Sequence, residues 1–247
     1  MNALAGKVAV VTGGTRGIGA AIVLRLLADG AQVVACGRRA PTSLPAEAVF
    51  VAADVREPAQ AASLVTEAVD RFGRLDIAIN NAGGSPYADA ATVSPRFVSK
   101  VVALNLLAPF YVAQAANAVM QGQPDGGLII NIGSVAASNS PPGMAAYAAA
   151  KAGLTALTRA LALEFGPLVR VNQVTAGLVR TSDAASYYGD SSQQEAIARL
   201  IPAGRMATPA DIAGACLLLA SPDAAYVTGA ELRVDGGGEL PARWVIT

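Results

Sequence analysis

Val8-Ala9-Val10-Val11-Thr12-Gly13-Gly14-Thr15-Arg16-Gly17-Ile18-Gly19 is the stretch that decides the fold. An apolar run, Val8–Val11, leads into a glycine-rich turn, and helical periodicity begins near residue 17. Glycines in such a turn let the backbone bend sharply and approach a diphosphate, which then binds the free N–H groups at the start of the helix. The alternative is an ordinary tight strand–helix turn. We expect residues 13–19, here called the glycine turn, to bind a dinucleotide.

Outward from this turn, short apolar runs alternate with longer helical segments. The runs are typical of strands buried on both faces: Val8–Val11, Val33–Ala35, Ala48–Val51, Leu75–Ile79, Leu128–Ile132 and Val169–Val174. Helical periodicity lies near 17–29, 58–72, 96–120, 147–165 and 209–220. This alternation predicts an α/β fold, a doubly wound parallel sheet with helices on both faces. We expect a single domain over 1–247.

Charge and composition limit the partners of the chain. It has 247 residues, with 18 Lys+Arg and 18 Asp+Glu, so its formal net charge is zero. This balance argues against nucleic-acid binding by phosphate neutralisation and against a basic tail on an anionic membrane. Charged residues make up 15%, against about 25% in typical soluble proteins, so we expect much of the helical surface to contact protein.

Histidine is absent and only two cysteines occur, Cys36 and Cys216. These counts exclude a Ser-His-Asp triad, an imidazole metal site and a disulfide framework, so we predict no metal site and a cytoplasmic location. No leader is evident at the N-terminus. The uncharged stretches 101–124 and 126–150 are interrupted by polar, Gly and Pro residues, so neither offers the roughly 20 continuous apolar residues of a membrane span.

Three polar residues in the second half of the chain point to chemistry. Tyr147 and Lys151 are four residues apart, so on a helix their side chains are neighbours. A free Tyr has a pKa of about 10, and a nearby ammonium favours the phenolate. Ser134 follows a strand, at the edge where open α/β sheets bind ligands. Each has a plainer explanation, a surface Tyr–Lys pair and a capping Ser.

Taken together, these residues resemble the short-chain dehydrogenase/reductase superfamily. The turn has the spacing T-G-x-x-x-G-x-G, and further matches follow along nearly the whole chain: Asp54-Val55, Asn80-Asn81-Ala82-Gly83, Asn105, Ser134, Tyr147-Ala148-Ala149-Ala150-Lys151, Val227-Thr228-Gly229 and Val234-Asp235-Gly236-Gly237. The resemblance implies a Rossmann-type fold and an NAD(P)-dependent oxidoreductase acting on CH–OH/C=O groups.

The resemblance also implies roles for individual residues. Tyr147 would be the general acid for ketone reduction, Lys151 would lower its pKa and hold the nicotinamide ribose, and Ser134 would polarise the carbonyl. Asn105 would support a water chain through Lys151, or else would only bond backbone at the helix bend. The implied cofactor-binding residues are Gly13, Thr15, Arg16, Gly17, Ile18, Gly19, Arg38, Asp54, Val55, Asn81, Ala82, Gly83, Tyr147, Lys151, Gly177, Val179 and Thr181. Ala176-Gly177 stands where the family often has Pro-Gly.

The second strand distinguishes between the two nicotinamide cofactors. A carboxylate at its end would bind the adenosine ribose and repel a 2′-phosphate. This chain instead reads Ala35-Cys36-Gly37-Arg38-Arg39, and Arg16 could converge on the same phosphate. NADP(H) is therefore favoured, and NAD(H) stays open, because both Arg38 and Arg39 could be solvated loop charges.

The segment 182–204, here called the lid segment, resembles the family's mobile substrate lid. An apolar pocket is expected from Tyr87, Val135, Pro141, Pro142, Met144, Tyr187 and Tyr188. This favours a ketone or secondary alcohol on a hydrophobic small molecule. A 3-oxoacyl-carrier-protein reductase is an alternative, weakened because 121–127 lacks Lys and Arg for an acidic partner.

Other readings lose support from residues that are present. A non-catalytic NADP-binding sensor or scaffold would not need Ser134, Tyr147 and Lys151 together. A dehalogenase-like lyase would lack the glycine turn, and an enoyl reductase would have a longer Tyr-to-Lys spacing. The apolar helices 96–120 and 147–165 predict a homodimer or homotetramer, with Leu161, Leu163, Phe110 and the tail 240–247 in its contacts.

Overall fold

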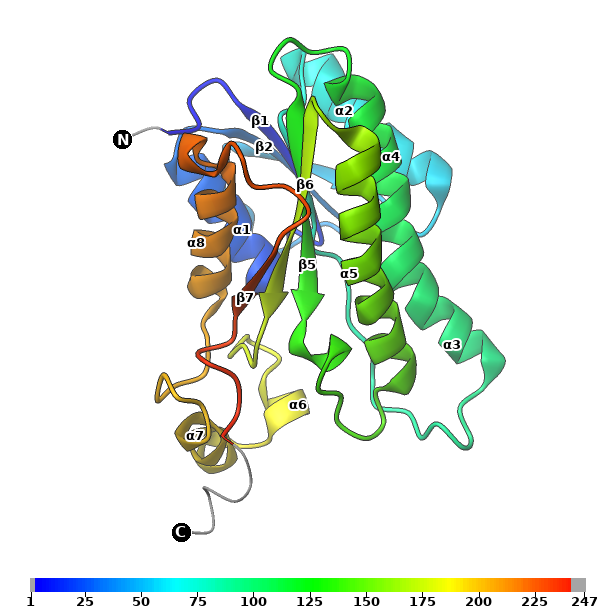
Figure 1. Cartoon of the computed structure of the whole chain (residues 1–247), viewed down its shortest axis with the longest axis vertical. Helices are drawn as coiled ribbons and strands as arrows, with labels where there is room; N and C mark the ends of the chain where they lie inside the picture. The colour runs from blue at the N-terminus through cyan, green and yellow to red at the C-terminus, as the bar shows by residue number, and fades with distance from the viewer. Residues whose placement is uncertain (1–2, 241–247) are drawn as a thin grey trace.

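A computed structural model describes residues 3–240 and contains one seven-stranded sheet. The strands are β1 (Val8–Thr12), β2 (Gln32–Gly37), β3 (Ala48–Ala52), β4 (Ile77–Asn80), β5 (Gly127–Ser134), β6 (Val169–Ala176) and β7 (Glu231–Val234). Their order is β3-β2-β1-β4-β5-β6-β7, and each neighbouring pair is parallel (Figure 1). The order reverses between β1 and β4, where open parallel sheets bind ligands at their carboxyl edge.

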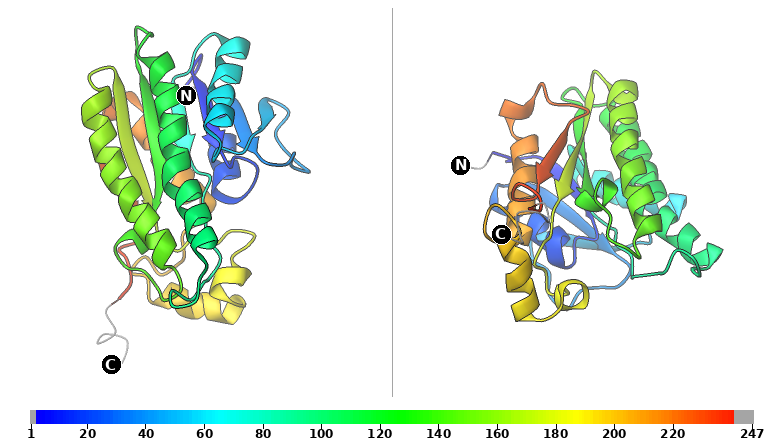
Figure 2. Two further views of the ribbon diagram at one scale, coloured as in Figure 1. Left: turned by 90° about the vertical axis from the view of Figure 1, so that its right-hand side faces the viewer. Right: turned by 60° about the horizontal axis from the view of Figure 1, so that its bottom comes forward.

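Helices cover both faces of this sheet, which confirms the predicted fold class. On one face lie α1 (Gly17–Ala28) and α8 (Pro209–Ala220); on the other lie α2 (Pro58–Phe72), α4 (Ala108–Met120) and α5 (Ala145–Phe165) (Figure 1). Two short helices of the lid segment, α6 (Ala185–Tyr188) and α7 (Ser191–Arg199), lie at the end of the sheet toward which the strands point (Figures 1 and 2). That end is the carboxyl edge.

The strand β1 shows why the segments predicted to be strands are apolar at every position. Successive side chains of a strand point to opposite faces. Val8 and Val10 pack into the core under α2, α4 and α5, whereas Ala9 and Val11 pack into the core under α1 and α8. All four are fully buried. A strand covered by helices on both sides has no polar face, so its sequence does not alternate.

Three local features differ from the sequence-based expectations. The helix expected over 96–120 is α3 (Pro95–Val102), a π-helical turn (Ala103–Leu107) and α4. The strand β7 was not predicted, although Glu231-Leu232-Arg233-Val234 alternates polar and apolar residues as half-buried strands do. The lid segment contains two helices, α6 and α7, where no helix was predicted.

The run Pro95–Met120 is long and apolar enough to pass the usual test for a membrane span. Core helices pass the same test, because the test uses only length and composition. Here Val112, Ala113, Ala116 and Met120 are fully buried against the sheet. The polar interruption at Asn105 lies in the π-helical turn and is also fully buried.

Candidate active site

The glycine turn fits a diphosphate. Gly13 and Gly17 have φ of +62° and +53°, in the left-handed region that favours glycine. A Cβ on Gly19 would lie 2.1 Å from the Gly13 carbonyl oxygen, so no side chain can be placed there. Within residues 3–240 no side chain caps the start of α1, and its first N–H groups stay available to an anion. Ile18 packs on the core beneath.

Two polar side chains hold this turn against the end of β4. The Thr12 hydroxyl accepts hydrogen bonds from the backbone N–H groups of Asn81 and Ala82, at 2.9 and 3.0 Å. The Asn81 amide donates to the carbonyl oxygens of Thr12 and Gly13, at 2.9 and 3.1 Å. The structure therefore uses the Asn81 side chain to hold the glycine turn in shape, while the backbone of Asn81 and Ala82 lies beside it.

The end of β2 lies next to the same turn. The Gly14 N–H donates to the Cys36 carbonyl oxygen at 3.1 Å, and a Cβ on Gly37 would lie 3.2 Å from the Thr15 methyl group. Arg38 follows directly and is exposed. Thr15 and Arg38, both expected to bind the cofactor, are thus brought together, and no carboxylate lies at the end of β2.

The Asp54 carboxylate forms an ion pair with Arg56, two residues further along the chain. Arg56 Nε donates to Asp54 Oδ1 at 2.9 Å. This hydrogen bonding lowers the pKa of the Asp54 carboxyl, and the charge of Arg38 adds a smaller effect in the same direction. The Val55 side chain, 5% exposed, packs into the core. Asp54 reaches the expected place, but its carboxylate is already paired, and Val55 has only its backbone to offer a cofactor.

Arg16 also has a partner in the structure. Its guanidinium forms an ion pair with Asp183 of the lid segment, and both side chains are largely exposed. A Cβ on Gly17 would lie 3.6 Å from the Thr181 methyl group, so this part of the chain lies across the glycine turn. Gly177 donates its N–H to the Val234 carbonyl oxygen at 3.0 Å, and Val179 pairs with Ala207. The expected residues Gly177, Val179 and Thr181 therefore line one continuous path from β6 to the turn.

Ser134, Tyr147 and Lys151 meet at the carboxyl edge. Ser134 is the last residue of β5, and Tyr147 and Lys151 lie in the first two turns of α5. The Ser134 hydroxyl lies close enough to the Tyr147 phenol to lower its pKa. Lys151 is 3% exposed; its Nζ donates to the Ile132 carbonyl oxygen at 2.7 Å and lies 5.7 Å from the centre of the Tyr147 ring. The three residues form one cluster.

The pKa values of this cluster correct one expectation. Burial raises the pKa of the Tyr147 phenol, and the nearby Ser134 hydroxyl only partly opposes this shift. Burial lowers the pKa of the Lys151 ammonium to about 8. The expected lowering of the Tyr147 pKa by Lys151 is wrong for this structure, because the ammonium is directed at the Ile132 carbonyl and burial dominates the environment of the phenol.

Asn105 is fully buried and its side chain bonds backbone. Its Nδ2 donates to the carbonyl oxygens of Gly84 and Val101, at 3.0 and 2.9 Å, and its Oδ1 accepts from the Gly84 N–H at 2.9 Å. A Cβ on Gly83 would lie 2.8 Å from Asn105 Oδ1 and 3.3 Å from Lys151 Nζ. Gly83 thus separates the two side chains. The geometry matches the plainer alternative, since no side-chain donor of Asn105 is left for a water chain.

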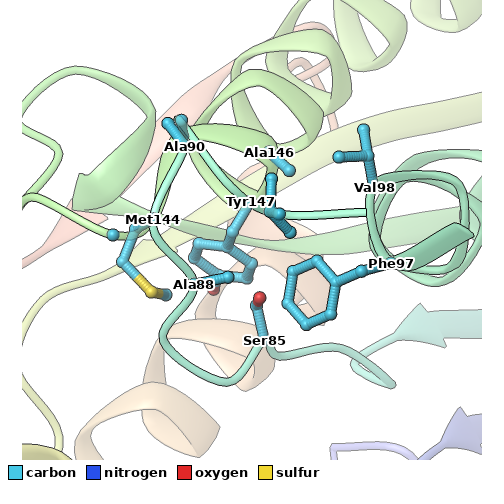
Figure 3. Close-up of a pocket in the computed structure, with 11 residues that line it drawn as sticks. Ser85, Ala88, Ala90, Phe97, Val98, Met144, Ala146 and Tyr147 are labelled. Carbon is cyan, nitrogen blue, oxygen red and sulfur yellow. The ribbon is translucent and has the colours of Figure 1, made fainter. Parts of the chain in front are cut away.

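A cavity of about 240 Å³ lies beside Tyr147 (Figure 3). Its lining comes from the loop after β4 (Ser85, Ala88, Ala90 and Val93), from α3 (Phe97 and Val98) and from the run Gly143–Tyr147. Of the expected pocket residues only Met144 lines it. Tyr187 and Tyr188 both raise the pKa of Tyr147, which shows that they lie near it. Tyr87 packs over Gly143, and 73% of its surface is exposed. Scattered apolar residues in a loop carry no periodic signal, so the sequence did not reveal this cavity.

Comparisons with known proteins agree with this geometry. The family model described as enoyl-(acyl carrier protein) reductase matches residues 13–239. The chain belongs to the short-chain dehydrogenase/reductase superfamily. A 3alpha-hydroxysteroid dehydrogenase of Mediterraneibacter gnavus is 37% identical, over 94% of this chain and 96% of that protein. An L-fucose dehydrogenase of Bos taurus is 38% identical, over 96% and 90%.

The solved structures show the same fold. The ligand-free aldohexose dehydrogenase of Thermoplasma acidophilum superposes with a TM-score of 0.89 at 29% identity, covering 95% of this chain and 94% of that one. As a member of this superfamily, the chain is an NAD(P)-dependent oxidoreductase acting on CH–OH/C=O groups. These relatives of this short-chain dehydrogenase/reductase act on steroids and on sugars.

Proposed function

We propose that the protein is an NADP(H)-dependent reductase that interconverts a ketone and a secondary alcohol on a hydrophobic small molecule. The observation that carries this proposal is the cluster of Ser134, Tyr147 and Lys151 at the carboxyl edge, beside an uncapped helix start and an apolar cavity. Each of the three side chains has a task that this arrangement supports.

Tyr147 donates the proton to the ketone oxygen. Tyr147 carries its proton at neutral pH, because the pKa of an ordinary phenol is about 10 and burial raises that of Tyr147 further. Ser134, whose hydroxyl lies near the Tyr147 phenol, binds the same oxygen and polarises the carbonyl. Lys151, four residues further along α5, would hold the nicotinamide ribose with an ammonium hydrogen that the Ile132 carbonyl does not take. In the oxidation direction Tyr147 takes the proton back.

The glycine turn and the arginines around it hold the cofactor, whose nicotinamide supplies the hydride when bound. The first N–H groups of α1 bind the diphosphate. Arg38 and Arg16 bind a 2′-phosphate, and the absence of an acid at the end of β2 removes the residue that would repel it. NADP(H) is thus the favoured cofactor. Asp54, held by Arg56, lies at the adenine end.

Specific residues and contacts argue against two alternative functions. A reductase of carrier-protein thioesters would use Arg159 and Arg170 to dock an acidic partner. Arg159 lies 3.9 Å from Glu231, and Arg170 donates to the carbonyl oxygens of Val227 and Leu219 at 3.0 and 3.1 Å. A non-catalytic sensor would not need the complete cluster of Ser134, Tyr147 and Lys151.

We also propose that the protein is an oligomer whose subunits contact one another through α4 and α5. Leu163 is 85% exposed, and Leu107 and Phe110 are also exposed, which leaves an apolar face. Leu161, expected on that face, is buried in the core instead, because it points toward the sheet. The tail 241–247 lies outside the described residues. We expect this cytoplasmic protein to show the mass of a dimer or tetramer in sedimentation, and a monomer mass would contradict the proposed oligomer.

The experiment that tests the proposal is NADPH oxidation by the purified protein with a panel of ketones and quinones, beside NADH and a panel of sugars. We expect oxidation of NADPH with apolar ketones and a slower reaction with NADH. Turnover confined to sugars, or to NADH, would contradict the proposed substrate class or cofactor.

A further inference from the structure

We propose that the cavity beside Tyr147 is an apolar subsite that receives one ring-sized hydrocarbon group attached to the carbonyl carbon. This inference rests on the proposed function and adds which residues bind which part of the substrate. Figure 3 shows Ala88, Met144 and Phe97 grouped around the Tyr147 ring. A substrate whose oxygen meets Ser134 and Tyr147 can place one of its two carbonyl substituents there.

The lining selects against polar groups. Among the eleven lining residues, all within the described part of the chain, none carries a charge, and only Ser85 and Tyr147 carry side-chain oxygens. The Ser85 hydroxyl donates to the Pro86 carbonyl oxygen at 2.9 Å, so it offers the cavity no proton. A hydroxyl group buried in this cavity would find few partners, and an unpaired buried hydroxyl is costly. The subsite therefore rejects a polyhydroxylated chain such as a sugar.

The volume sets the size of the group. An engineered apolar cavity of about 150 Å³ binds benzene. The cavity beside Tyr147 measures about 240 Å³, so it holds one six-membered ring with room to spare. A fused four-ring skeleton would enter with one ring only. The second substituent of the carbonyl then lies on the side of the lid segment, where Tyr187 is 60% exposed.

A fixed place for one substituent has a stereochemical consequence. If the ring lies in the cavity while the oxygen meets Tyr147, only one face of the carbonyl is presented to the nicotinamide side. Reduction of cyclohexyl methyl ketone should then give one enantiomer of the alcohol in large excess. Butanone, whose substituents are both small, should be reduced with little preference.

The test uses the substitution Ala88→Leu, which fills the cavity from the loop after β4. Its matched control is Ala91→Leu, the same change at an exposed residue outside the lining. A single methylene in a hydrophobic pocket changes kcat/KM by about 10- to 200-fold. We expect Ala88→Leu to lower kcat/KM for cyclohexyl methyl ketone by about tenfold or more and to reduce the enantiomeric excess. Butanone turnover should fall by a smaller factor than that of cyclohexyl methyl ketone, and Ala91→Leu should behave as wild type.

Binding provides a readout that does not depend on turnover. With NADP⁺ bound, the ketone cannot be reduced, so calorimetry measures its dissociation constant directly. Wild type and Ala91→Leu should bind cyclohexyl methyl ketone, and Ala88→Leu should bind it about tenfold more weakly. Equal dissociation constants for all three proteins would overturn the subsite, as would tighter binding of L-fucose than of cyclohexyl methyl ketone by wild type.

A second variant keeps the subsite testable if Ala88→Leu does not fold. Phe97→Leu enlarges the cavity, so kcat/KM for naphthyl methyl ketone should rise relative to cyclohexyl methyl ketone. An unchanged ratio would contradict the subsite. Reduction of ketones by wild type without any effect of these variants would leave the reductase in place and remove only the subsite, whereas absence of any ketone turnover would remove the proposed function itself.

Discussion

Arg16 and Asp183, 167 residues apart in the sequence, form an ion pair that joins the glycine turn to the lid segment. Arg16 is also one of the two arginines that we assign to the 2′-phosphate. A carboxylate on the same guanidinium would compete with that phosphate, and the pair would then couple the position of the lid segment to cofactor binding.

Removing the competing carboxylate should strengthen NADPH binding. In Asp183→Asn the Arg16 guanidinium is released, and we expect the dissociation constant for NADPH to fall by about two- to fivefold, since exposed ion pairs contribute up to about 1 kcal/mol. NADH binding should change less. Fluorescence titration measures both constants. The control Glu195→Gln removes an exposed acid from α7, and an equal effect of both substitutions would show that only net charge matters.

Reversing the charge at Arg38 should change the cofactor preference. Arg38→Asp puts a carboxylate where the 2′-phosphate binds, so the ratio of kcat/KM for NADPH over NADH should fall by about tenfold or more. Arg39→Asp is the matched control at the next residue and should have a smaller effect. An unchanged ratio in Arg38→Asp would place the 2′-phosphate elsewhere.

The buried Lys151 predicts a pH-dependent stability. Its pKa is lowered from 10.5 to about 8 in the folded chain. Below about pH 8 the ammonium is charged in both folded and unfolded states, and its burial opposes folding. From there to about pH 10.5 the unfolded chain binds the proton and the folded chain does not, so the stability contributed by this residue rises with pH.

Chemical denaturation of Lys151→Met and wild type isolates this effect, because the thiols and other phenols titrate in both. Between pH 7 and pH 10, the free energy of unfolding of wild type should rise by about 2 kcal/mol relative to that of Lys151→Met. Lys100→Met, at an exposed lysine, should show no such change. A difference between wild type and Lys151→Met that stays constant with pH would contradict the burial of the charge.

Two glycine-to-alanine substitutions should change stability in opposite directions. Gly19→Ala places a Cβ 2.1 Å from the Gly13 carbonyl oxygen, so we expect a loss of about 1 to 3 kcal/mol and weaker NADPH binding. Gly214 lies inside α8 with no atom within 4 Å of an added Cβ, and Gly214→Ala should gain about 0.5 to 1 kcal/mol. Urea denaturation measures both. A stable Gly19→Ala with unaltered cofactor affinity would contradict the tight turn.

The sequence predicted the parts of the fold that depend on local pattern. Strands such as β1 are apolar at every position because both faces of the sheet are covered, and the glycine turn is recognisable because each glycine meets a steric demand. The strand β7 escaped prediction because it is short and only half-buried, so its apolar signal is weak. The π-helical turn at Asn105, whose side chain contacts the Gly84 backbone, escaped because apolar periodicity does not distinguish it from the α-helices on either side.

The candidate site was predictable in its residues and less so in their pairing. Tyr147 and Lys151 share a helix face by their spacing alone, but Ser134 joins them only because β5 ends there. The partners of Arg16 and Asp54 depend on side-chain contacts, with the lid segment and with Arg56, that no periodicity records. The cavity beside Tyr147 depends on a loop, and loop packing follows from the finished fold.

We assign the Tyr147 phenol as the acid that protonates the ketone oxygen. The most direct measurement compares wild type and Tyr147→Phe for NADPH oxidation with cyclohexyl methyl ketone and for NADPH binding. The phenol is assigned to the substrate oxygen, so turnover should fall by about 100-fold or more while the dissociation constant for NADPH changes by less than about threefold. Equal turnover by the two proteins would contradict the mechanism.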